Sequence, residues 1–439
     1  MPLTIKAFKS QMKIRSLCKP WQLLLFCGLL CLITRATSAK TSLFRAPKQS
    51  VFNVLEMGAR GDGKTDDTPA FQRAIDRANA IGGGVVFVPR GNFLIKTHLV
   101  VKENVTLKGI FEAPPARTQD LGSTLLAVEN AGGLNGTPFI TLKANGTLKG
   151  LSIFYPNQRE QMPPLVYPWT VRGDGDNCSI VDTLMVNPYA AVDFGTVSAG
   201  RHYINGLYAQ ALYRGVFVDK CYDVGRIQNV HFWQFWRITP EIDAWTRQNA
   251  IAFILGRTDW EYLSNCFCIQ YKTGYQFVAL KDGPGNAVLT NCGSDQGPLS
   301  VDVQAVQDHA GVSFTNGQFM AGIHIGPNNR GPVKFTSCGF WGEGGITQNH
   351  AVLEGKNQTI FSSCHFIGWD QKQTGAPCLQ VEGGGLSVQG CDFMDLGKAQ
   401  IHLGPNVESA IILGNRLRGG QKIDTQSQGD VQMGLNSQK

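Results

Sequence analysis

Apolar and polar residues alternate in short runs along most of the chain. Each run carries Asn, Asp, Ser or Gly two residues after an apolar position, as in Leu263-Ser-Asn and Phe361-Ser-Ser. Aligned on that polar position, successive runs follow one another at 21 to 27 residues, apart from one step of 36 residues. The aligned positions are Asp182, Asn205, Asn229, Asn265, Asn291, Asn316, Ser337, Ser363, Gly390 and Gly414. Strands and turns with such a period indicate a solenoid, and the leucine consensus of leucine-rich repeats is missing.

The repeat also separates inward from outward side chains. Successive residues of a strand point to opposite faces, so positions one and three after the aligned residue should both face inward. The first column holds Cys266, Cys292, Gly317, Cys338, Cys364 and Cys391. The second column holds Phe319, Phe340, Phe366, Phe393 and Leu417. We therefore expect a continuous core with a column of buried thiols, although strand spacing would also permit disulfides. Amides five positions after the aligned residue predict a hydrogen-bonded ladder of Asn187, Gln210, Gln234, Gln270 and Gln296.

A helix is predicted ahead of the repeats. Thr68 suits the N-cap and Pro69 the first helical position. Phe71, Ala74, Ile75 and Ala78 then form one apolar face, and the glycines of residues 82–84 end the helix. We expect this helix to cover the open end of a stacked sheet.

The same segment resembles a known family. Gly58, Gly61-Asp-Gly, Thr65-Asp-Asp-Thr and the Val-Val-Phe-Val-Pro-Arg-Gly of residues 85–91 are similar to the N-terminal signature of the pectate-lyase-like superfamily. The closest branch is the one grouped with rhamnogalacturonases and epimerases. The signature covers about residues 52–110. The resemblance implies an all-β, single-stranded right-handed parallel β-helix with an N-terminal capping helix, and it implies polysaccharide substrates.

The reaction does not follow from this resemblance. The ordered motifs of polygalacturonases do not occur, and there is no clear carboxylate cluster for calcium with an arginine base, as in pectate lyases. Cys and His spacings typical of metal sites are also missing, so we expect no metal and no cofactor, and calcium is an option only if the chain is a lyase.

The first residues are typical of a signal peptide. Basic residues precede the apolar run Leu23 to Ile33, and small residues such as Ala36 and Ala39 follow it. We therefore predict a signal peptide at residues 1–39 and a secreted or periplasmic protein. Six of the 40 basic residues and none of the 33 acidic residues lie in this segment, so the rest of the chain is nearly balanced in charge. This balance indicates neither a nucleic-acid partner nor, after signal cleavage, a membrane partner.

The remaining chain is expected to form one domain. Residues 40–110 should contain the cap and the first turns of the solenoid, residues 111–420 the parallel β-helix, and residues 421–439 a flexible C-terminal tail. The sequence does not indicate an oligomeric state.

Two long connections are the candidate functional region. The 36-residue step contains an aromatic and charged segment, and a step of 32 residues precedes Asp182 if Gly150 belongs to the repeat. Both extra segments leave the same strand position, so they should rise on one side, three turns of the solenoid apart. Aromatic rings stack on sugar rings and arginines bind carboxylates, which predicts these substrate-binding residues: Trp233, Trp236, Arg237, Asp243, Trp245 and Arg247. The alternative is a loop that folds its own tryptophans onto the helix.

Catalytic groups are proposed from the alternation of neighbouring strands. Asp193 and Asp219 are expected to point outward on adjacent turns, at a diagonal distance of roughly 8 Å that suits an inverting glycosidase. His231, outward before the aromatic segment, is the alternative base. Both carboxylates would equally fit an ordinary solvated surface.

Three functions remain open at this point. A glycoside hydrolase would use the two carboxylates and release a reducing end, whereas a polysaccharide lyase would use a base near an acidic sugar and leave an unsaturated product. The third is a non-catalytic glycan-binding or surface β-helix. We favour an enzyme that cleaves a polysaccharide or oligosaccharide, because the two long connections would form a cleft, and an acidic substrate is one option.

Overall fold

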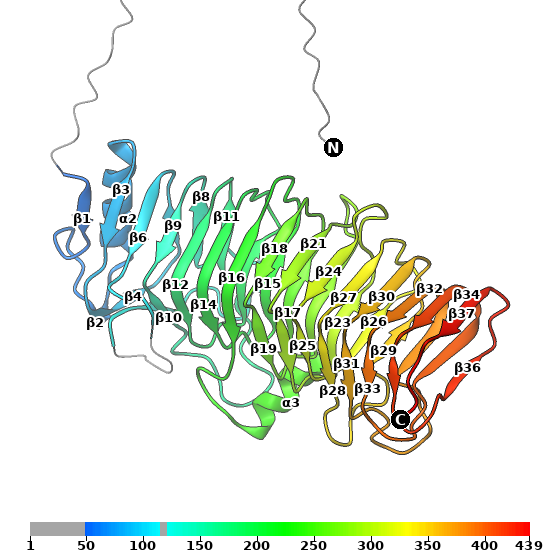
Figure 1. The fold of residues 1–439 in the computed structure, drawn as a ribbon. Helices are drawn as coiled ribbons and strands as arrows, with labels where there is room; N and C mark the ends of the chain where they lie inside the picture. The colour runs from blue at the N-terminus through cyan, green and yellow to red at the C-terminus, as the bar shows by residue number, and fades with distance from the viewer. Residues whose placement is uncertain (1–48, 115–120) are drawn as a thin grey trace, which may run out of the picture. The chain divides into compact units, whose positions relative to one another are not determined.

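The computed structural model describes residues 49–114 and 121–439; the predicted signal peptide lies outside them. Residues 49–439 form one compact unit. The chain coils through short strands that pair in parallel with the strands one turn earlier and later, which makes a parallel β-helix (Figure 1). We call one turn of the coil a rung. Each rung contributes to up to three stacks of strands.

Stack 1 contains the strands that lead into the aligned polar position of each repeat. Its members are β1 (Val51–Asn53), β3 (Gly84–Phe87), β6 (Val105–Lys108), β9 (Thr147–Lys149), β12 (Ser179–Met185), β14 (Tyr203–Ala209), β16 (Arg226–Phe232), β18 (Glu261–Ser264), β21 (Ala287–Thr290), β24 (Val312–Thr315), β27 (Val333–Thr336), β30 (Gln358–Ser362), β32 (Leu379–Gln389), β34 (Ile401–Leu413) and β37 (Asp430–Gly434). The ends of β12, β14 and β16 continue into stack 2.

Stack 2 follows the polar position, and stack 3 closes the rung. Stack 2 also contains β2 (Asp62–Asp66), β4 (Gly91–Ile95), β7 (Ser123–Ala127), β10 (Ser152–Phe154), β19 (Phe267–Ile269), β22 (Gly293–Asp295), β25 (Gln318–Phe319), β28 (Gly339–Trp341), β31 (His365–Ile367), β33 (Asp392–Phe393) and β35 (Arg416–Leu417). Stack 3 contains β5 (Leu99–Val101), β8 (Ile140–Lys143), β11 (Trp169–Asp174), β13 (Ala190–Phe194), β15 (Arg214–Val218), β17 (Ile251–Leu255), β20 (Thr273–Phe277), β23 (Leu299–Val303), β26 (Gly322–Ile325), β29 (Ala351–Leu353), β36 (Ile423–Thr425) and the first halves of β32 and β34.

The aligned polar residues form the bend between stacks 1 and 2. Asn229, Asn265 and Asn291 have φ values of 53°, 54° and 55°, in the left-handed region that Asn tolerates better than most residues. Their amides also bond along the stack, since Asn265 donates to Asn229 at 3.1 Å and Asn291 to Asn265 at 3.2 Å. One alignment was wrong by a residue: Gly206, at φ 78°, occupies the bend rather than Asn205. The strand register agrees, because Leu207 pairs with Val230.

The predicted inward columns form the core. Phe319, Phe340, Phe366 and Phe393 are fully buried, and their neighbouring rings stack at centroid distances of 5.5, 4.9 and 4.9 Å. The nine cysteines of the described residues are free thiols and all are buried. The amide ladder is only partly present: Gln234 donates to Gln270 and Gln270 to Gln296, whereas Asn187 and Gln210 bond to backbone groups of the long connections.

Helix α2 (Thr68–Ala80) precedes the regular rungs. It packs against β1, β3, β5 and β6 at the N-terminal end of the coil (Figure 1), and its buried residues include the four of the expected apolar face. The N-cap is Asp67, so the assignment to Thr68 was one residue late. The Thr68 hydroxyl instead donates to Asp66 at 2.6 Å and accepts the Lys96 amide at 2.9 Å.

The C-terminal segment is not a flexible tail. Strands β36 and β37 pair in parallel with β34, and Ser437 makes a bridge to Arg416. The last long strand would otherwise expose unpaired backbone groups, and these pairings satisfy them.

Within the described residues, no helix is long and apolar enough to cross a membrane.

Candidate functional site

Both long connections leave stack 2 at one position. Ile153 of β10 pairs with Met185, which pairs with Ala209, which in turn pairs with Phe232 of β16. The two departures are therefore three rungs apart on the same side, as the repeat predicted. The second connection contains helix α3 (Pro240–Asn249), whose N-cap Thr239 accepts the Ile242 amide at 3.3 Å.

The tryptophans of the second connection mostly pack inward. Trp236 is 5% exposed and shares an apolar cluster with Leu184, Leu212 and Phe235. The Trp245 indole N–H donates to the Leu212 carbonyl at 2.9 Å. Trp236 is thus a core residue of this loop and was wrongly assigned to substrate binding, because a large apolar ring gains more from burial than from exposure.

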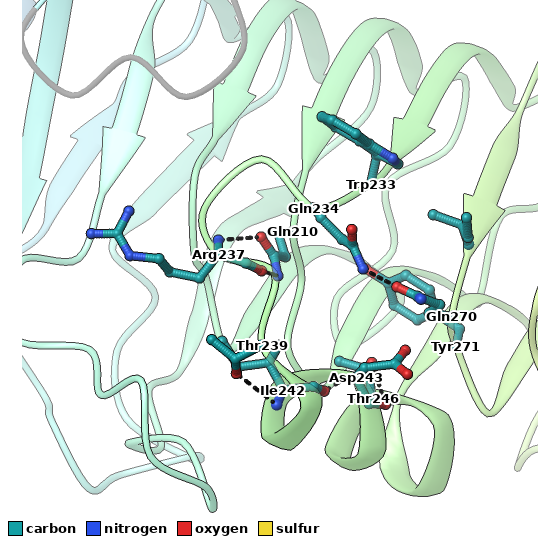
Figure 2. Close-up of a pocket in the computed structure, with 11 residues that line it drawn as sticks. Gln210, Trp233, Gln234, Arg237, Thr239, Ile242, Asp243, Thr246, Gln270 and Tyr271 are labelled. Carbon is teal, nitrogen blue, oxygen red and sulfur yellow. Dashed lines mark hydrogen bonds between the residues drawn. The ribbon is translucent and has the colours of Figure 1, made fainter.

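The space beside α3 is too small for a sugar. Trp233, Arg237 and Asp243 line a pocket of about 10 Å³, roughly room for one water molecule (Figure 2). The guanidinium of Arg237 points away from this pocket in Figure 2 and pairs with Glu160 of the first connection at 2.8 Å. Arg247 pairs with Asp243 and with Glu343, both at 2.9 Å. The Arg237–Glu160 pair links the two connections, and the space beside α3 does not accommodate a glycan.

The predicted carboxylate pair is buried. Asp193 has no exposed surface; it accepts the Gly195 and Thr196 amides at 3.0 and 2.8 Å and Arg172 Nε at 2.6 Å. Asp219 is 3% exposed and accepts the Arg257 amide at 2.7 Å. The outward position of Asp193 is confirmed, because its neighbours Val192 and Phe194 both belong to the core and successive strand residues point to opposite faces. The expectation that Asp193 is exposed was wrong, because the turn after β13 folds back over its carboxylate. Asp193 and Asp219 therefore do not form an acid–base pair with access to water.

His231 lies within an aromatic group. Its ring centroid is 5.3 Å from that of Phe267, 5.6 Å from Phe235 and 6.3 Å from Trp233. Burial lowers the pKa of His231 and favours the neutral imidazole. Its role as a base stays a prediction.

An open cleft lies on the outer side of stack 3, next to the ends of both connections. It has a volume of about 490 Å³ and is lined by Leu134, Asn135, Trp169, Arg172, Thr196, Tyr213 and Arg214. We call it the arginine cleft. Its volume falls within the range of pockets that hold small ligands. The sequence analysis missed it, because its residues come from four rungs and no local motif joins them.

The two arginines of this cleft are held in place. Arg172 is fixed through its Nε by the buried Asp193. The Arg214 guanidinium lies 3.5 Å from the centroid of the Tyr213 ring and donates to the Asn249 carbonyl at the end of α3 at 2.9 Å. Burial lowers the pKa of Arg214 from its ordinary value, although it stays a cation at neutral pH. Tyr213 itself stacks on Tyr189 at 4.9 Å, and Trp169 stacks on Phe217 at 6.2 Å.

A second charged group lies on stack 3, nearer the C-terminus. His324 Nδ1 is 3.0 Å from an Asp302 oxygen, and Nε2 is 3.0 Å from a Glu354 oxygen. Burial opposes protonation of His324, but the two carboxylates outweigh it and raise its pKa. His324 therefore links the buried carboxylate of Asp302 with the more exposed carboxylate of Glu354.

Comparison with known proteins matches part of the chain. Residues 51–152 match the family described as "Rhamnogalacturonase A/epimerase, pectate lyase-like". Alginate lyase 7 of Azotobacter vinelandii is 45% identical over 65 residues, which cover 13% of this chain and 8% of that protein. Mannuronan C5-epimerase AlgE3 of the same organism is also 45% identical over 65 residues, covering 13% of this chain and 4% of that protein.

A solved structure is similar over most of the chain. A mutant tailspike protein of E. coli bacteriophage HK620, in complex with a pentasaccharide, has a TM-score of 0.59 and 13% identity, and the match covers 84% of this chain and 71% of that one. At this identity the likeness shows the fold alone.

Proposed function

Because residues 51–152 match a pectate-lyase-like family and the chain folds as a parallel β-helix, we propose that it acts on an acidic polysaccharide bound in the arginine cleft. One observation carries the proposal: two fixed guanidinium groups and two aromatic rings line the same open space of about 490 Å³. Guanidinium groups bind carboxylates through paired hydrogen bonds, and an aromatic face such as that of Trp169 packs against the C–H face of a sugar ring. The names of two partial relatives, an alginate lyase and a mannuronan epimerase, specify polymers of acidic sugars.

The chemistry that suits this cleft is β-elimination. The carboxylate of the bound sugar would pair with Arg172 and Arg214, which offsets the charge that develops when the neighbouring carbon loses its proton. The oxygen of Tyr213, in its deprotonated form, is the proposed proton acceptor at the same cleft. The electron pair of the broken C–H bond forms a double bond, the bond to the leaving sugar oxygen breaks, and this oxygen takes the proton back from Tyr213 to leave as a hydroxyl group. Asp193 acts as a positioning residue, since it contacts Arg172 rather than the sugar.

Binding and chemistry are tested separately. Arg214→Gln should weaken binding of acidic oligosaccharides by roughly 10- to 100-fold, the scale of one charge-assisted pair, and leave neutral oligosaccharides unaffected. Arg330→Gln is the matched control, because Arg330 is an exposed arginine paired with Asp308, away from the cleft. Isothermal titration calorimetry measures both. Equal affinity in Arg214→Gln and the unaltered protein would refute this binding site.

Tyr213→Phe should keep binding and lose turnover. Absorbance of the unsaturated product follows the lyase reaction, and a reducing-end assay follows hydrolysis. Reducing ends without unsaturated product would favour a hydrolase instead. The carboxylates linked by His324 would then be the group to test, through Asp302→Asn and Glu354→Gln. A secreted or periplasmic location is part of the same proposal, and the signal-peptide pattern of residues 1–39 supports it.

A further inference from the structure

Three side chains with metal-binding atoms meet inside the coil, away from the arginine cleft. They are His202, just before β14, Cys221, which bridges to Thr258, and Glu261, the first residue of β18. All three are fully buried. His202 Nε2 lies 2.9 Å from Glu261 Oε1, and the ligand atoms of the three residues all lie within 4.8 Å of one another.

Gly225, which has no side chain, leaves the space in which they meet. Tyr203 pairs with Arg226 and Arg226 with Tyr262, so the residues before them, His202, Gly225 and Glu261, occupy one column on three successive rungs. The backbones of His202 and Glu261 are thus two rungs apart, or roughly 10 Å at strand spacing. A Cβ at Gly225 would lie 2.2 Å from Glu261 Oε2 and 2.6 Å from His202 Nε2. Only glycine leaves the two side chains free to face each other across the middle rung.

The hydrogen bonds of the group leave an acceptor unsatisfied. His202 Nδ1 lies 2.8 Å from the Ala199 carbonyl, so this nitrogen carries a proton and donates it there. That bond orients Nε2 toward Glu261. The second oxygen of Glu261 has no hydrogen-bond partner, although it is completely buried. A buried carboxylate oxygen without a partner is costly and needs a positive charge or a donor close by.

We propose that His202, Cys221 and Glu261 bind one zinc ion. Nitrogen, sulfur and carboxylate oxygen are the three ligand types that Zn²⁺ accepts, at about 2.0 to 2.3 Å. One thiolate and one carboxylate neutralise the ion, which suits a fully buried site. The Nδ1–H bond from His202 to a backbone carbonyl is the outer contact that commonly orients a zinc-bound imidazole. A nucleophilic role for Cys221 does not fit, because a substrate would need access to a thiol with no exposed surface.

Zinc binding would replace two protons. The Cys221 thiol donates to the Asp223 carbonyl at 2.7 Å, and this proton must leave when the thiolate binds the ion. The second proton is that of His202 Nε2, which lies 2.9 Å from Glu261 Oε1 and must lose its proton to bind the ion.

Metal content and a cobalt spectrum test the site. The chain without the predicted signal peptide is treated with a chelator to remove bound metal and is then titrated with Zn²⁺ or Co²⁺. We expect one ion per chain, a higher Tm with zinc, and a thiolate-to-cobalt charge-transfer band. Cys221→Ser should abolish the band, and His202→Gln should lower the affinity at least tenfold. Cys178→Ser is the matched control, because Cys178 is an equally buried thiol outside the group.

The alternative is a buried ion pair of His202 and Glu261 with a neighbouring thiol. In that case the unaltered protein would bind no zinc and show no cobalt–thiolate band, which overturns the proposal. Retention of the band in Cys221→Ser would also overturn it. If that variant does not fold, Gly225→Ala serves as a second test, since its methyl group would occupy the space between His202 and Glu261 and should prevent binding.

Discussion

The rungs after residue 263 differ from the rungs between residues 150 and 262 in the length of their connections and in the kind of side chain that they bury. In the later rungs, short connections join strands whose inward positions repeat Phe and Cys, and the rings of Phe340 and Phe366 stack at 4.9 Å. In the earlier rungs the connections are long, and charged side chains such as Asp193 and Glu261 are completely buried. Stacking of like residues stabilises the coil, whereas insertions and glycines open the places in which charged groups can gather.

Two buried histidines show the same difference. His350 belongs to the later rungs, where its ring lies 6.0 Å from Phe366 and 6.3 Å from Trp369. Burial lowers the pKa of His350 to about 4. His202 is equally buried in the earlier rungs, but the carboxylate of Glu261 raises its pKa. A facing carboxylate, rather than burial alone, decides the charge of a histidine inside this coil.

The largest expected effect tests the stacked core. Phe366→Asp removes a ring held between Phe340 and Phe393 and places an unpaired charge in the core, so we expect the protein to unfold or aggregate. Ile367→Asp is the matched control, because the next side chain points outward and is 38% exposed. Soluble yield and thermal unfolding measure both variants. A soluble Phe366→Asp protein with an unchanged Tm would contradict the assigned core.

The next effect tests whether the long connection is part of the core. Trp236→Ala should lower the free energy of unfolding by about 3–5 kcal/mol, the range for a buried aromatic residue. Trp233→Ala should cost less, because Trp233 is only partly buried at the edge of the same cluster. Urea unfolding and limited proteolysis of residues 233–250 provide the measurements. An equal loss of unfolding free energy in the two variants would contradict the assignment of Trp236 to the core of this connection and of Trp233 to its edge.

The smallest expected effect is the pH dependence of stability that the two buried histidines cause. The unfolded chain binds a proton on His350 near pH 6.5, but the folded chain does so only near pH 4, so stability falls as the pH drops between these values. The loss should be on the order of 3 kcal/mol and should disappear in His350→Gln. His202 has the opposite sign in the metal-free protein: its contribution is complete below about pH 6.5 and is lost as the pH rises through its raised folded value. Urea unfolding from pH 4 to 9 tests both, and parallel pH profiles for His350→Gln and the unaltered protein would refute the assignment.

The candidate site was predicted in part. The alignment placed Asp193 opposite Phe217 and both long connections on one side, because register depends on the local alternation of residues. It could not indicate that the turn after Asp193 covers the carboxylate, or that α3 packs until about 10 Å³ is left beside Trp233. Those outcomes depend on how the connections pack, which no repeat encodes.

The sequence by itself determined the coil, its inward columns and the bends at Asn229, Asn265 and Asn291, since each follows from alternation and from the few residues that tolerate a left-handed turn. Only the tertiary structure decided which polar groups meet. Arg172 and Arg214 share a cleft because stacking brings separate rungs together, and His202 reaches Glu261 because the rung between them has glycine at position 225. Such contacts join residues from different rungs, and their distances are set by the spacing of the stack rather than by neighbours along the chain.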